Sequence, residues 1–102
     1  MANTFKNYVA SDVGTAPNTV YTVPAATTSV MIGCNIANKT TAAIYVDVQL
    51  GSTYLVKGAP IPSGSALSVL DGKIIIETGE TFVVTSDADT SADVVLSVLE
   101  QT

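Results

Sequence analysis

The sequence predicts an all-β protein: a single-domain β-sandwich of eight or nine short strands with a jelly-roll-like arrangement. Three observations lead to this prediction. Apolar and polar residues alternate at period two, turn signals recur about every ten residues, and helical periodicity is missing. The composition, 47% hydrophobic and 13% charged with abundant Thr and Val, suits half-buried pleated surfaces. A length of 102 residues fits one compact domain.

The first segment is predicted to be separate in role from the rest. We expect residues 1–12 to form an N-terminal arm or an edge strand, with a short strand over 4–10, and residues 13–102 to form the sandwich. The next strand is expected over 19–23. It ends at Pro24, because proline cannot donate to a strand ladder.

The run that follows is predicted to be a strand with one buried face. Its period-two pattern puts Val30, Ile32, Cys34 and Ile36 on that face, and Met31, Gly33 and Asn35 on the other. Gly33 indicates a bulge or a close backbone approach, and a polar turn is expected over 38–41.

The clearest alternation predicts a strand that opens a hairpin over 43–56, with the turn at 51–52. Its inward residues are Ile44, Val46, Val48 and Leu50, and its outward residues are Tyr45, Asp47 and Gln49. The remaining elements are a rigid loop over 60–64, a strand over 67–70, a hairpin turn at Asp71-Gly72, a strand over 73–77, a turn over 78–80, a strand over 81–86, a polar loop over 87–91 and a last strand over 93–99.

Residues suited to catalysis are scarce, and we predict no enzyme and no cofactor. With no His, the usual general base and the usual metal ligand are both missing, which excludes Ser-His and Cys-His nucleophiles and most zinc sites. The best polar cluster is Asp87, Asp89 and Asp93, whose oxygens suit Ca²⁺. The spacing lacks the Gly and the distal Glu of a calcium loop, so a solvated loop is the favoured interpretation.

Charge and cysteine usage restrict the partners and the compartment. The net charge is −5 and the four Lys are scattered, which argues against nucleic acid. No long apolar run or leader is found, so we expect no membrane and synthesis in a cytoplasm. Cys34 is expected to be a small buried hydrophobe, with an intermolecular disulfide or a reactive thiol as the alternatives. Asn38-Lys39-Thr40 matches a glycosylation sequon and is expected to mark an exposed turn.

Four aromatic residues are the candidates for an interface. Phe5 and Tyr8 fall on opposite faces of a strand; they either anchor in a groove of a neighbouring chain or close one end of the core. Tyr45 and Tyr54 are expected to meet across the outer face of the hairpin, where they would also offer a contact patch.

Several segments together resemble a known group of proteins. They are the opening MANTFKN, the YTVPA corner followed by TTSVMIGCNIANKT, the segment TYLVKGAPIPSGSAL and the ending SADVVLSVLEQT. Over nearly the whole chain, the sequence resembles small virion structural proteins of tailed bacteriophages, often those of aquatic bacteria. These motifs are turns and strands, so the resemblance carries no catalytic residues.

The resemblance implies a non-enzymatic role in a virion assembled in a bacterial cytoplasm. The first expectation is a capsid decoration or cement protein on the head surface, with the major capsid protein and further copies of itself as partners. A small sandwich gains stability from neighbours that bind only its folded form. The alternative is a tail, neck or fibre component that contacts other tail proteins or a host glycan. A third class, a small enzyme or a metal-dependent lectin using Asp87, Asp89 and Asp93, stays open at this point.

Overall fold

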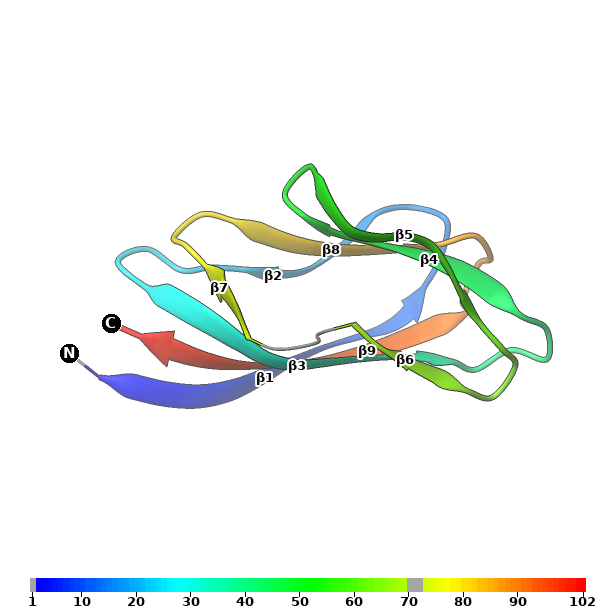
Figure 1. The fold of residues 1–102 in the computed structure, drawn as a ribbon, viewed down its shortest axis with the longest axis horizontal. Coiled ribbons are helices and arrows are strands. Elements are labelled where there is room, and N and C mark those ends of the chain that lie inside the picture. The colour runs from blue at the N-terminus through cyan, green and yellow to red at the C-terminus, as the bar shows by residue number, and fades with distance from the viewer. Residues whose placement is uncertain (1, 70–72) are drawn as a thin grey trace.

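The computed structural model describes residues 2–69 and 73–102. Within these residues the chain forms nine β-strands and no helix, and the strands make two antiparallel sheets packed face to face. The predicted all-β sandwich is confirmed. Figure 1 shows the two layers as an elongated slab, whose extents are 45 × 21 × 21 Å.

The strands follow the predicted order. Their bounds are β1 Asn3–Val13, β2 Asn18–Thr22, β3 Thr28–Asn38, β4 Ile44–Leu50, β5 Thr53–Ile61, β6 Ala66–Ser68, β7 Ile74–Ile76, β8 Thr81–Ser86 and β9 Ala92–Gln101. The five-stranded sheet has the order β1-β9-β3-β6, with β7 also on β3, and the four-stranded sheet has the order β2-β8-β4-β5.

The pairing is that of a jelly roll, in which one long antiparallel hairpin is rolled up into two sheets. β1 pairs with β9, β2 with β8, β3 with both β6 and β7, and β4 with β5, so the pairs are nested from the chain ends inward. Rolling this hairpin places successive pairs in alternate sheets and gives the observed strand orders.

One predicted hairpin is wrong. Asp71 and Gly72 themselves lie outside the described residues, but the strands on either side of them both run antiparallel to β3. β6 pairs with 35–37 and β7 with 29–31, so they occupy successive stretches of the same edge and run in the same direction. Together they take the place of one strand of the jelly roll.

The core lies between the sheets and is built from the inward positions of every long strand. Its largest fully buried side chains include Phe82, Met31, Ile36 and Leu96. Burying a large apolar side chain contributes about 1.5–3 kcal/mol, so this layer supplies most of the force that holds the two sheets together. Inward Ile44, Val46 and Val48 are buried as predicted, and Leu50 is half-buried.

The predicted inward face of β3 is wrong in its first half. Cys34 and Ile36 point inward as predicted. Met31, predicted on the outer face, is fully buried, and Ile32, predicted on the buried face, is 42% exposed. The register against β9 shifts between Met31 and Gly33, which is a β-bulge. The extra residue reverses the alternation, so Val30 and Ile32 do not share a face with Cys34. The expectation of a bulge at Gly33 is confirmed.

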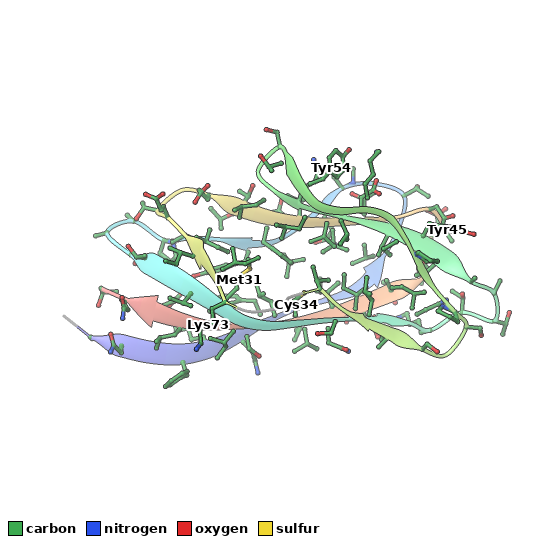
Figure 2. The ribbon with its side chains drawn as sticks, viewed as in Figure 1. Met31, Cys34, Tyr45, Tyr54 and Lys73 are labelled. Carbon is green, nitrogen blue, oxygen red and sulfur yellow. The ribbon has the colours of Figure 1, made fainter. Side chains whose placement is uncertain are left out.

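The β4–β5 hairpin is confirmed, but two details differ from the prediction. Pro60 and Ile61 belong to β5 and not to a loop, and Pro60 is tolerated because β5 is an edge strand. The two-residue turn pairs Tyr54 with Gln49, and register shifts further from the turn pair Tyr45 with Pro60. The two tyrosines therefore do not meet across the strands, and they lie at separate places in Figure 2.

The sequon asparagine was predicted to lie in an exposed turn, and this prediction is wrong. Asn38 ends β3 and is only 2% exposed. Its Nδ2 donates to the carbonyls of Ala42 and Ile61 at 2.8 and 2.9 Å, and its Oδ1 accepts from the backbone and hydroxyl of Thr40. The side chain thus links the end of β3 to the following turn and to β5.

Candidate functional site

The outer face of the five-stranded sheet carries an apolar row that crosses four strands. Antiparallel pairing places Ile75 of β7 opposite Val30 of β3, Val30 opposite Leu99 of β9, and Leu99 opposite Phe5 of β1. Partners directly opposite on a sheet project from the same face. Phe5 is 73% exposed and Ile75 is 62% exposed, so both ends of the row face solvent.

A second row lies four residues further along the sheet. It pairs Val9 with Val95 and Val95 with Asn35. Val9 is 64% and Val95 is 43% exposed. Together with the bulged Ile32, the two rows form what we call the outer apolar face: Phe5, Val9, Val30, Ile32, Ile75, Val95 and Leu99.

The strip between the two rows is shallow because its side chains are small. Asn7, Ser97 and Gly33 are paired across β1, β9 and β3. A shallow hollow of about 310 Å³ lies here, and its lining includes Phe5, Asn7, Ile32, Ser97 and Lys6. Asn7, Ser97 and Gly33 are uncharged, and Lys6, the charged residue at the lining, is paired with Glu100 of its own chain. The cost of desolvating this strip is therefore low.

The outer face of the four-stranded sheet is different in chemistry. Its outward positions are mostly polar and include Thr19, Thr81, Thr85, Asp47 and Gln49, with Tyr45 and Tyr54 at 51% and 46% exposure. Lys57 Nζ lies 4.4 Å from the centroid of the Tyr54 ring. The sandwich therefore has one apolar and one mainly polar outer face.

Sequence reasoning missed most of the outer apolar face, although a signal was present. In β9 and β7 apolar residues follow one another without alternation, as at 94–96, 98–99 and 74–76. A one-sided antiparallel strand should alternate, so consecutive apolar residues indicate that both faces bear apolar side chains. Of the four predicted interface residues, only Phe5 belongs to this face.

Tyr8, the second predicted interface residue of β1, points into the sandwich. Its ring lies 4.3 Å from that of Tyr21, centroid to centroid, and its hydroxyl donates to Glu100 Oε2 at 2.8 Å. Burial raises the pKa of Tyr8, and the Glu100 carboxylate raises it further. Tyr8 thus packs against β2 through Tyr21 and is hydrogen-bonded to β9 through Glu100.

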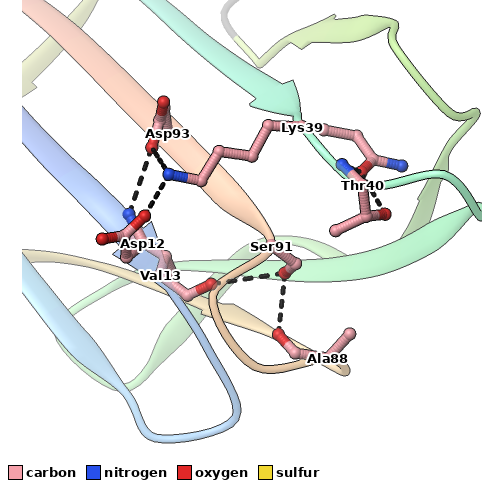
Figure 3. A network of polar contacts seen from close by, with 8 residues as sticks. Asp12, Val13, Lys39, Thr40, Ala88, Ser91 and Asp93 are labelled. Carbon is pink, nitrogen blue, oxygen red and sulfur yellow. Dashed lines mark hydrogen bonds and ion pairs between the residues drawn. The ribbon is translucent and has the colours of Figure 1, made fainter.

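The three aspartates of the candidate calcium loop do not converge. Asp87 Oδ1 accepts from the Tyr45 amide at 3.0 Å, and Asp89 Oδ1 accepts from the Thr15 hydroxyl at 3.0 Å. Asp93 accepts from the Asp12 amide and pairs with Lys39, as Figure 3 shows. The Asp12 amide and the Lys39 ammonium lower the pKa of Asp93. Among the described residues no group of acidic, His or Cys side chains is arranged to hold a metal ion.

A polar hollow of about 460 Å³ lies at this end of the sandwich. Its lining includes Asp12, Thr15, Asn18 and Asp89. Lys39 contacts both Asp12 and Asp93, so the end of β1 and the start of β9 are tied to the residue that follows β3 (Figure 3). The Thr15 hydroxyl donates to Asp89 and ties the loop before β2 to the loop before β9. The carboxylates here are engaged in holding loops together.

Cys34 is buried among the core side chains, in agreement with the favoured interpretation (Figure 2). Burial raises the pKa of its thiol to about 12, so the reactive thiolate is scarce at neutral pH.

Comparisons with known proteins add no relative. No protein-family model matches the chain, and a search of curated proteins gives no significant match. In the part of the chain that the structure describes, no helix has the length and apolarity needed to cross a bilayer.

Proposed function

We propose that the chain is a non-enzymatic virion structural protein of a tailed bacteriophage, a decoration or cement protein on the outside of the head. The outer apolar face binds the shell formed by the major capsid protein. Bound copies bury surface across the junctions between capsid subunits and so stabilise the shell.

The observation that carries this proposal is the outer apolar face itself. Exposed large apolar side chains on one sheet face, with a mainly polar face opposite, are typical of a surface that meets another protein. Docking costs about 4–15 kcal/mol in lost freedom, and each fully buried apolar side chain returns about 1.5–3 kcal/mol. Several of these side chains must therefore be covered together, which a continuous sheet face permits.

The fold adds support of a weaker kind. Jelly rolls occur in viral capsid and lectin domains, but a fold by itself does not determine function. The resemblance of MANTFKN and the segments quoted with it to phage virion proteins points in the same direction.

A tail, neck or fibre position is the second candidate. It uses the same rigid sandwich, and the exposed Tyr45 and Tyr54 favour it, because aromatic rings on a polar face suit contacts with a glycan or with a polar protein surface. Copy number separates the two positions. Hundreds of copies in each particle, counted by quantitative mass spectrometry, indicate the capsid, whereas a few to tens indicate the tail.

The direct test introduces a charge into the outer apolar face. Ile75→Lys places an ammonium where the partner must exclude water, so occupancy on particles should fall at least about tenfold. Thr19→Lys, on the opposite outer face, is the matched control and should keep normal occupancy. Full occupancy of the Ile75→Lys protein on particles would exclude this face as the docking surface.

A further inference from the structure

We propose that two copies of the chain pair along the free edge of β1. The two β1 strands run antiparallel about a two-fold axis at Asn7, so the five-stranded sheets of both copies become one continuous sheet. The partner is a second copy of this chain, and the bonds between the copies are backbone hydrogen bonds.

β1 is the long unprotected edge of the sandwich. It has 11 residues, pairs on one side with β9 and ends the strand order of its sheet. Phe5 and Val9 are more than 60% exposed. Positive backbone φ occurs in β1 only at Asp12, near its end, so the edge from Asn3 to Val9 is regular.

The other described edges are poor templates for strand addition. β5 contains Pro60, a left-handed Gly58 and two register shifts against β4. β2 has only 5 residues and a bulge, and β6 and β7 have 3 residues each. Proline, bulges and short length are among the devices that protect edges from pairing, and β1 has none of these three between Asn3 and Val9. A charged side chain is another such device, but the one charged residue of this segment, Lys6, pairs with Glu100 of its own chain.

The backbone groups that face outward on β1 can be identified from its end. Ala2 and Thr102 exchange both backbone hydrogen bonds, at 3.2 and 3.0 Å. In an antiparallel ladder such pairs recur every second residue, so the even residues of β1 bond to β9. The amide and carbonyl groups of Asn3, Phe5, Asn7 and Val9 therefore point away from β9, toward an added strand.

A two-fold axis at Asn7 places the outward-facing backbone groups of the two copies opposite each other, where they can form hydrogen bonds. It pairs residues 3–11 of one copy with residues 11–3 of the other, so Phe5 of each copy lies opposite Val9 of its partner. An aromatic and a β-branched residue directly opposite each other stabilise a strand pair by about 0.2–1 kcal/mol, and this contact occurs twice. Centring the axis at Lys6 instead would place the two ammonium groups opposite each other, which is unfavourable.

Charge makes the β1 edge a better place than most of the surface for contact with a second copy. The net charge is −5, so most surfaces of two copies repel each other. The β1 edge from Asn3 to Val9 contains one charged residue, Lys6, whose Nζ lies 3.4 Å from Glu100 of its own chain. The pairing segment is therefore close to neutral.

The consequence for the particle rests on the proposed function. Pairing at β1 leaves the outer apolar face uncovered and joins the two copies of this face side by side. Docking of one copy then makes docking of the second an intramolecular step, which raises the overall affinity without any new contact to the shell.

Sedimentation velocity of the purified chain tests the pairing. We expect a reversible dimer in a series from about 1 µM to about 1 mM, which spans weak and moderate interfaces. Asn7→Pro removes an amide that faces solvent in the monomer, so β1 keeps its bonds to β9 while the dimer is lost. Asn7→Ala keeps the amide and should keep the dimer. A wild-type monomer throughout the series, or an unchanged dimer in Asn7→Pro, would overturn the proposal.

Cross-linking tests the register without relying on the proline variant. Asn7→Cys puts two thiols on residues whose Cα atoms are about 5.5 Å apart in the dimer, whereas the two cysteines of Val9→Cys lie about 14 Å apart along the strands. A short bismaleimide should cross-link Asn7→Cys much faster than Val9→Cys. The buried Cys34 makes the wild-type protein the blank. Equal rates, or a faster Val9→Cys, would contradict the axis at Asn7.

These measurements use the chain without particles, and the Ile75→Lys experiment measures occupancy on particles. A monomeric wild-type chain that still occupies particles would overturn the dimer and leave the proposed function standing. A chain that dimerises but does not occupy particles would overturn the proposed function and leave the dimer standing.

Discussion

The hydroxyl of Tyr21 donates to Oε2 of Glu100 across a distance of 2.5 Å. Tyr21 belongs to β2 and Glu100 to β9, so this hydrogen bond joins the two sheets through the interior. Glu100 is only 5% exposed, and Tyr8 and Lys6 also contact its carboxylate. A buried charge is tolerated only when it is hydrogen-bonded and paired, and these three side chains of β1 and β2 supply that compensation.

Removal of the Tyr21 hydroxyl should destabilise the fold. Tyr21→Phe keeps the ring but takes one donor from the buried carboxylate and one partner from Ser29, so we expect a loss of about 1–3 kcal/mol. Urea denaturation measures the free energy of unfolding. Tyr54→Phe, at an exposed ring, is the control and should change it by less than about 0.5 kcal/mol. Equal free energies for the two variants would show that the link between the sheets contributes nothing.

Glu100 should make the protein sensitive to acid. The Tyr21 hydroxyl, with Tyr8 and Lys6, lowers the pKa of Glu100 below its ordinary value of 4.5, against the opposing effect of burial. A carboxyl group with a lower pKa in the folded state stabilises the fold above its unfolded-state pKa, and this contribution is lost as the pH falls through the folded-state pKa. The window therefore lies below about pH 4.5.

Glu100→Gln tests the expected direction of this pH dependence of stability. The variant should be less stable than the wild type at pH 7, with a shallower loss of unfolding free energy between pH 5 and pH 2. Urea midpoints across this range measure the slope. An identical slope in the two proteins would assign the acid sensitivity to other carboxylates, such as Asp93, whose pKa is also lowered.

Cys34 should be inert in the native protein and reactive after unfolding. Its burial and its pKa of about 12 leave little thiolate at pH 8. A disulfide reagent should therefore label it slowly in buffer and rapidly in concentrated urea, with the absorbance of the released thiolate as the readout. Rapid labelling in buffer would revive the predicted alternatives, a reactive thiol or an intermolecular disulfide.

Gly14 and Gly33 should respond in opposite ways to substitution by alanine. A Cβ at Gly33 meets nothing within 4 Å, so Gly33→Ala should stabilise the protein by about 0.4–1 kcal/mol through lower entropy of the unfolded chain. A Cβ at Gly14 would lie 3.2 Å from Asp89 Oδ1 and 3.3 Å from Asp89 Cα. Gly14→Ala must push the Asp89 loop away, and we expect a loss of about 1 kcal/mol.

Thermal melting of both glycine variants provides the check. A bulge that needs glycine for its backbone would show itself as a lower melting temperature in Gly33→Ala. Equal stabilisation by both substitutions would mean that the loop at Asp89 yields without cost.

Local sequence predicts the buried positions of some strands and fails for others. In β4 every second residue is apolar, and the buried positions Ile44, Val46 and Val48 follow at once from the period of a strand. In β3 the same rule fails after one bulge, because a single extra residue moves the later side chains to the other face. Gly33 indicated where a bulge was possible but not which side chains would remain buried.

The sequence by itself determined that the chain is all-β, where nearly every strand lies and that a sandwich would bury the alternating faces. Those properties follow from the period of apolar residues and from turn residues, which act over a few neighbours. Only the tertiary structure decided that β6 and β7 share one edge of β3, and that Phe5, Leu99, Val30 and Ile75 form one row. Pairing between strands far apart in the chain sets these neighbours, and no local pattern encodes which strands will lie side by side.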